Sequence, residues 1–187
     1  MAKLVSPDFV GYFLALVLAI IQSHGQIMMD LEAQIQLLID NAPQDGMTPK
    51  LMVSIAPVLI AIAQKLRHHQ YFILQNSEQD WLLTTLSNRA NPGIEKQVIY
   101  AFPTIQDISL ILDAGRDPHL LPTSMYVTHI LFQLVAMKPV HSLIFIETPG
   151  TLAHLVEVSR FEIESQIQRQ LQQQQSKGKK IIPPNIA

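Results

Sequence analysis

Hydrophobic residues recur every four and three positions along residues 10–38, which is the spacing of one face of an α-helix. The positions are Val10, Leu14, Val17, Ile21, His24, Met28, Leu31, Ile35 and Leu38. Ser6 suits the N-cap, Pro7 suits the first helical position, and Pro43 ends the run. The pattern therefore predicts a long helix over residues 7–43 with an apolar face to bury.

A second helix is predicted immediately afterwards. Thr48 and Pro49 begin it, it runs to about Arg67, and apolar residues cover most of its circumference, so it should be largely buried. Pro57 lies in its interior, where proline removes a backbone donor, so we expect a kink there. The two helices together predict a helical hairpin over residues 1–68.

Short runs rich in aromatic and β-branched residues follow, separated by turn residues. They predict strands at residues 71–74, 81–86 and 97–102, arranged as an antiparallel meander. Residues 81–86 also fit a short helix capped by Ser77. Residues 141–147 carry a continuous apolar run, which indicates a central strand covered on both faces.

Three further helices are predicted around these strands, at residues 103–112, 122–137 and 151–176, each begun by a proline-containing turn. Residues 177–187 combine lysine, glycine and proline, a composition typical of a flexible tail.

The predicted elements indicate an α+β fold in one compact domain over residues 1–176. Its expected parts are the long N-terminal helical hairpin, a core at residues 69–150 with a small, mainly antiparallel sheet and flanking helices, and a long C-terminal helix. A chain of 187 residues is long enough to bury a core of its own.

Composition narrows the classes of function. The chain is 48% hydrophobic and 15% charged, and its net charge of −2 gives no broad attraction to nucleic acid. Zero cysteines exclude disulfides, thiolate zinc sites and cysteine nucleophiles, and suit a cytoplasmic location. Phe9 to Ile21 is an apolar run shorter than the roughly 20 residues that span a bilayer. We therefore expect a buried or interfacial helix there, with peripheral membrane contact as the alternative.

Candidate catalytic chemistry is sparse. His154 and Glu157 have the spacing of a metal pair on one predicted helix, but no third ligand is apparent and a surface role is favoured. His68 and His69 suit a helix C-terminus, where imidazoles meet the last carbonyls. His24 interrupts the apolar seam, where it either bonds to water or sets the register with a partner. Serine-elbow, phosphate-loop and dinucleotide motifs are absent, so we expect no enzymatic activity, metal or cofactor.

The order of the extended segments resembles the SseB-type α+β domain over roughly residues 71–150. The residues that carry the resemblance are Tyr71-Phe72-Ile73-Leu74, Trp81-Leu82-Leu83-Thr84, Val98-Ile99-Tyr100-Ala101-Phe102-Pro103-Thr104 and Leu143-Ile144-Phe145-Ile146 with Pro149-Gly150. The resemblance implies a fold and transfers no catalytic residue.

These observations favour a non-enzymatic protein-protein interaction module, such as an adaptor, assembly factor or regulatory subunit, that acts through exposed apolar helix faces. The expected partner is another protein or a second copy in a homodimer. The predicted contact residues are Val17, Ile21, His24, Met28, Leu31 and Ile35 on the first helix and Ile163, Ile167 and Leu171 on the last. The alternatives are a small-molecule-binding regulator with a pocket between sheet and helices, and a peripheral membrane-associated protein.

Overall fold

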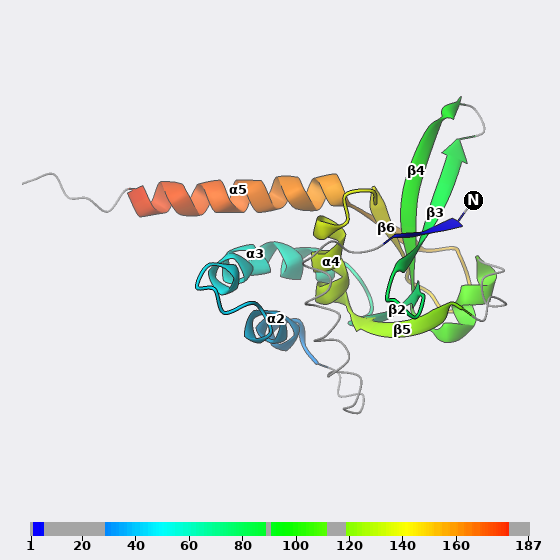
Figure 1. The fold of residues 1–187 in the computed structure, drawn as a ribbon, viewed down its shortest axis with the longest axis horizontal. Helices are drawn as coiled ribbons and strands as arrows, with labels where there is room; N and C mark the ends of the chain where they lie inside the picture. Colours follow the sequence, from blue (N-terminus) through cyan, green and yellow to red (C-terminus); the bar gives the residue numbers. More distant parts are fainter. Residues whose placement is uncertain (1, 6–28, 89–90, 112–118, 180–187) are drawn as a thin grey trace, which may run out of the picture.

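The computed structural model describes residues 2–5, 29–88, 91–111 and 119–179, and these form an α+β fold (Figure 1). A seven-stranded mixed sheet stands beside four α-helices. The elements in chain order are β1 (Ala2–Val5), α2 (Leu31–Asp40), α3 (Thr48–Ala63), β2 (Gln70–Gln75), β3 (Trp81–Asn88), β4 (Asn91–Phe102), the 3-10 helix η1 (Ile105–Leu110), β5 (Leu121–Tyr126), α4 (Val127–Ala136), β6 (Ser142–Ile146), β7 (Leu155–Ser159) and α5 (Arg160–Lys179).

The long strand β4 organises the sheet. Its first part pairs antiparallel with β3, and its last residues pair antiparallel with β2. On its other side β4 pairs in parallel with β6, which pairs antiparallel with β7. Strand β1 borders β3, and β5 borders β2. Within the described part of the chain, β1, β5 and β7 therefore form the edges of the sheet.

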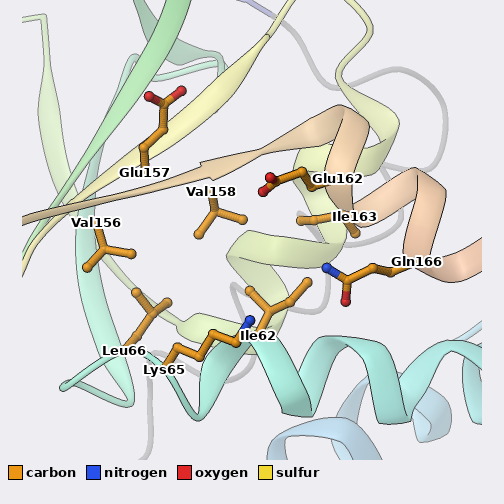
Figure 2. A pocket seen from close by; sticks show the side chains of 9 residues that line it. All are labelled: Ile62, Lys65, Leu66, Val156, Glu157, Val158, Glu162, Ile163 and Gln166. Atoms are coloured by element: carbon orange, nitrogen blue, oxygen red, sulfur yellow. The ribbon is translucent and has the colours of Figure 1, made fainter.

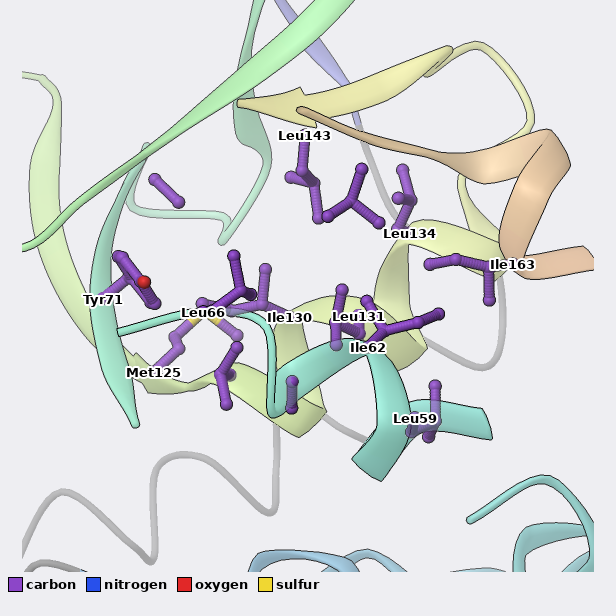
Figure 3. Close-up of a cluster of buried hydrophobic side chains, with 14 of the residues drawn as sticks. Leu59, Ile62, Leu66, Tyr71, Met125, Ile130, Leu131, Leu134, Leu143 and Ile163 are labelled. Atoms are coloured by element: carbon purple, nitrogen blue, oxygen red, sulfur yellow. The ribbon is translucent and has the colours of Figure 1, made fainter. Parts of the chain in front are cut away.

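The main core lies between one face of the sheet and the helices (Figure 3). Tyr71, Met125 and Leu143 of the sheet meet apolar side chains of α3, of the turn that follows it, of α4 and of α5. These are Leu59, Ile62, Leu66, Ile130, Leu131, Leu134 and Ile163. A smaller cluster on the opposite face includes Leu74 and Ile146 and is covered by η1. All five residues of β6 are buried, which confirms the prediction of a central strand covered on both faces.

Helix α2 starts later than the seam predicts. Asp30 has an extended backbone and acts as N-cap, because its Oδ1 accepts a hydrogen bond of 2.7 Å from the N–H of Ala33. The prediction of one continuous helix over residues 7–43 is therefore corrected: a helix boundary falls at Asp30. Residues 6–28 lie outside the described residues, so the predicted hairpin stays a prediction.

The second predicted helix is confirmed as α3, which ends at Ala63 rather than near Arg67. Asp45 precedes it and accepts hydrogen bonds from the backbone N–H groups of Met47 and Thr48. Pro57 lies inside α3 without ending it. Because proline carries no N–H, the carbonyl four residues earlier lacks its usual helical donor.

The three predicted strands are confirmed as β2, β3 and β4, and residues 81–86 are extended rather than helical. The predicted helix at 103–112 is shorter and of the 3-10 type.

Two predicted helices are wrong in their first part. Residues 121–126 form β5 before α4, and residues 155–159 form β7 before α5, which then runs beyond residue 176 to Lys179. Proline-containing turns resemble helix starts in the sequence, but here they lead into strands that pair with distant segments. Pairing with other strands thus determines the structure of these segments, although their local sequences favour a helix start.

Candidate functional site

Strand β7 is an edge strand whose outer backbone groups can be identified from its register. The N–H of Glu147 donates to the carbonyl of His154 over 3.0 Å, and the N–H of Arg160 donates to the carbonyl of His141 over 2.9 Å. In an antiparallel ladder, every second pair of opposite residues exchanges hydrogen bonds. Residues 154, 156, 158 and 160 therefore direct their backbone groups toward β6. The three residues between them, Leu155, Glu157 and Ser159, direct their N–H and C=O groups away from β6. We call these outward groups the β7 edge.

The edge at β5 is different. The N–H of Val127 donates to the carbonyl of His69 over 3.0 Å, so the same alternation places Pro122 at an outward position. Proline has no N–H to offer there and blunts a sheet edge. Strand β7 contains no proline, so its outward donors are intact.

A notch lies beside the β7 edge, between β7, the end of α3 and the start of α5 (Figure 2). Val156 and Val158 point from β7 toward α3, while Glu157 points to the other side of the strand. The cavity volume is about 80 Å³, more than one water molecule occupies and less than a cavity that holds benzene, so it suits one short aliphatic side chain. Its lining is Ile62, Lys65, Leu66, Val156, Glu157, Val158, Glu162, Ile163 and Gln166.

Three large apolar side chains are exposed around the β7 edge. Leu152 is 43% exposed before the strand, Leu155 is 47% exposed at its first position, and Phe161 is 74% exposed in the first turn of α5. Single exposed apolar residues are ordinary, but here they flank the outer edge of a strand and a notch with both apolar and polar walls. This combination is characteristic of a surface that another polypeptide covers.

The charges at this site belong to both signs. Lys96 of β4 forms an ion pair with Oε1 of Glu157 on a partly exposed surface. Partial burial raises the pKa of Glu157, but the interaction with the nearby Lys96 ammonium group favours the charged form, and the pKa is lowered. Glu162 and Lys65 stand on the wall of the notch. With Lys96, the site therefore carries two carboxylates and two ammonium groups, and the Glu157 carboxylate lies on the side of β7 away from the notch.

A buried polar cluster centred on Glu147 lies at the end of β6. Its Oε1 accepts a hydrogen bond of 2.5 Å from the Tyr71 hydroxyl, and its Oε2 accepts one of 2.7 Å from the backbone N–H of Arg67. The His68 ring Nε2 lies 3.1 Å from the Glu147 carbonyl oxygen. Burial raises the pKa of the Tyr71 hydroxyl, and the hydrogen bond to Glu147 raises it further. Because both oxygens bind inside the chain, this cluster ties the end of α3 to the sheet.

A shallow hollow lies on the other side of this segment. It has a volume of about 270 Å³, and Arg67, His68, His69 and Phe72 line part of it. That volume is below the roughly 300–1,000 Å³ of typical small-molecule sites.

The predicted contact residues are separated by the structure. Leu31, Ile35 and Ile163 are buried in the chain's own core, so they are not exposed contact residues. Ile167 packs against that core in part, and Leu171 is half-buried farther along α5. Val17, Ile21, His24 and Met28 lie outside the described residues. Several apolar side chains are exposed elsewhere, among them Met47 and Val53, but Leu152, Leu155 and Phe161 lie beside an edge strand. We call the β7 edge together with these three side chains the β7 margin. The prediction of a helix over residues 151–176 concealed it.

His154 and Glu157 do not share a helix face, because one precedes β7 and the other lies within it. Among the residues that the structure describes, no group of three His, Asp or Glu side chains is arranged to hold a metal ion. In the same residues, no helix has both the length and the apolar character needed to cross a membrane.

Comparison of the chain with protein-family models, with curated proteins and with solved structures gave no match. The resemblance to the SseB-type domain therefore stays a prediction, and function must be argued from the site itself.

Proposed function

We propose that this chain is a non-enzymatic protein-protein interaction module, an adaptor, assembly factor or regulatory subunit, that binds its partner along the β7 margin. The observation that carries the proposal is the conjunction of outward backbone groups on β7, a partly apolar notch beside them and three exposed apolar side chains around both. Proteins normally blunt or cover such an edge, because it can pair with another chain.

The proposal moves the contact surface away from the helix seam. Leu31, Ile35 and Ile163 stabilise the chain's own core, whereas Leu155 and Phe161 gain little from intramolecular packing. Covering such side chains with a partner removes apolar surface from water, which is the main favourable term in association. The notch of about 80 Å³ and the hollow of about 270 Å³ are each smaller than typical small-molecule sites, so neither favours a small-molecule regulator.

The proposal is tested by comparing the proteins that three forms of the full chain capture from an extract of the organism's own cells. The test form is a Leu155→Asp and Phe161→Asp double variant, which places charge on the β7 margin. The matched control is Met47→Asp, which changes an equally exposed apolar residue before α3. We expect the unchanged chain and the control to retain the same protein, and the double variant to lose it by tenfold or more.

Light scattering coupled to size-exclusion chromatography at two concentrations separates a second copy from a different partner. If all three forms capture the same proteins in equal amounts, the β7 margin is not the contact surface and the proposal fails.

A further inference from the structure

We propose that the β7 edge binds an extended, basic segment of another protein as an added β-strand, with alternate apolar side chains directed toward the notch. This inference rests on the proposed function and names the class of partner that the margin accepts. Binding of such a segment requires free backbone groups on β7, space for the apolar side chains of the segment and charges that suit its basic residues.

The backbone requirement is met by the register of β7. Leu155, Glu157 and Ser159 direct N–H and C=O groups outward, while Val156 and Val158 direct theirs to β6. A partner strand therefore forms ladder hydrogen bonds to β7 without breaking any bond to β6. Such main-chain bonds provide affinity that is independent of the partner's side chains.

The side-chain requirement follows from alternation along the strand. Residues of the partner that lie opposite Val156 and Val158 project to the α3 side, where the notch lies between Ile62, Leu66 and Ile163 (Figure 2). Residues opposite Glu157 project to the other side of the sheet, next to its carboxylate. The partner segment should therefore alternate apolar and polar residues with a period of two.

The charge preference is for a basic segment. Glu157 is the middle one of the three outward residues, its side chain is 43% exposed, and Lys96 contacts one oxygen of its carboxylate. A lysine or arginine directly opposite Glu157 forms a favourable cross-strand pair, whereas an acidic residue there is repelled.

A second copy of this chain fits the edge poorly. The antiparallel register that engages all three outward residues places Glu157 directly opposite Glu157 of the second copy. Like charges directly opposite each other destabilise a strand pair. We therefore commit to a different protein as the partner.

The experiment uses the full chain and a synthetic peptide, acetyl-Gly-Val-Lys-Val-Lys-Val-Gly-amide, with a control peptide in which both lysines are glutamates. Binding is followed by amide NMR titration, and hydrogen exchange is measured with and without peptide. We expect saturable binding of the lysine peptide and at least threefold weaker binding of the glutamate peptide. The amides of Leu155, Glu157 and Ser159 should become protected, while those of Val156 and Val158, already bonded to β6, should change little.

Two variants at one position separate the backbone from the side chain. Glu157→Ala removes the carboxylate and keeps the outward N–H, so the lysine peptide should bind about twofold to fivefold more weakly. Glu157→Pro removes the carboxylate and the N–H together, so binding should fall at least tenfold below that of Glu157→Ala. Because this N–H makes no bond to β6, circular dichroism should show both variants folded. The exchange measurement on the unchanged chain tests the inference even without the proline variant.

Three results would overturn the inference. The first is no saturable binding of the lysine peptide, and the second is binding without protection of the three outward amides. The third is concentration-dependent dimerisation that protects those amides in the absence of peptide, which would make a second copy the occupant. In the first two cases, edge-dependent capture from extract would still support the proposed function, with contact through side chains instead of an added strand.

Discussion

At the scale of single residues, the ring of His129 on α4 is buried with one nitrogen that forms no hydrogen bond among the described residues. The residue has no exposed surface, its Nδ1 lies 3.4 Å from the Thr128 hydroxyl, and its Nε2 has no hydrogen-bond partner within the described part of the chain. Burial lowers the pKa of His129 to about 3, because charging the ring there would require desolvating an ion. The folded protein therefore holds this ring neutral, at some cost in stability from the unbonded nitrogen.

This shift predicts a loss of stability in mild acid. The unfolded chain binds a proton at His129 near pH 6.5, whereas the folded chain binds it only near pH 3, so protonation of the unfolded state draws the equilibrium toward unfolding as the pH falls between these values. Between pH 7 and pH 5 the free energy of unfolding should fall by about 2 kcal/mol from this group. Urea denaturation at both pH values measures the change.

The matched variants are His129→Leu, which should remove most of this pH dependence, and His154→Gln at an exposed position, which should leave it unchanged. Equal pH dependence in His129→Leu and the unchanged chain would contradict the assignment.

At the scale of elements, α3 carries an internal proline on its exposed side. Val53 and Pro57 both lie on that side, four residues apart. In a regular helix residue 57 would donate its N–H to the Val53 carbonyl, but proline has no N–H to donate. The apolar residues on the other side of the helix, among them Leu59 and Ile62, anchor α3 in the core.

Pro57→Ala should therefore stabilise the protein. Alanine restores the missing donor and is the residue most favourable to a helix, while the unfolded chain regains some of the freedom that proline removes. We expect a net gain on the order of 1 kcal/mol, measured by urea denaturation. Pro49→Ala is the control, because proline at the start of α3 replaces no helical hydrogen bond and its loss should not stabilise. A destabilised Pro57→Ala variant would mean that the core depends on a helix shape imposed by proline.

The sequence predicts those elements whose signals are local. The apolar stripe of α3 and the continuous apolar run of β6 are both present in short windows, and both elements are confirmed. Strands β5 and β7 depend on pairing with β2 and β6, and partners such as Gln70 and Tyr126 lie 56 residues apart, so no local pattern contains that information.

The candidate site was missed for the same reason. The only local signal was the alternation Val156-Glu157-Val158, which is too short to outweigh the helix start read at Thr148 to Gly150. The outward direction of the Glu157 N–H follows from the ladder with β6, and the notch follows from three elements meeting, so neither can be read from the sequence.

At the scale of the whole molecule, α5 projects from the sheet and lies along α3 (Figure 1). Its 20 residues make a rod about 30 Å long. Ile163, in its first turns, is fully buried against the core, and Arg160 fixes its start through a hydrogen bond to the Val140 carbonyl and an ion pair with Glu164. Ile163 and Arg160 thus anchor the start of α5, while Ile167 and a hydrogen bond of 3.5 Å from Gln174 Nε2 to the Ser54 carbonyl hold it along α3.

Ile163→Ala should accordingly lower the free energy of unfolding by about 2–5 kcal/mol, because it leaves a cavity between α5, α3 and the sheet. Phe161→Ala, two residues away on the exposed side, should change it by less than about 0.5 kcal/mol. Thermal and urea unfolding measure both. If the two variants were equally stable, α5 would not depend on this anchor.

The three sheet edges have unequal consequences for growth of an assembly. Strand β1 spans only four residues, and β5 presents the ring of Pro122 where a neighbour would need an N–H. A fibre formed by strand pairing between subunits needs two free sheet edges on every subunit, one for each neighbouring subunit. Strand β7 has five residues and no proline, so of these three edge strands it is the best suited to accept an added strand. Under the proposed strand addition, one partner segment fills the β7 edge of each chain, which favours complexes of fixed stoichiometry over fibres.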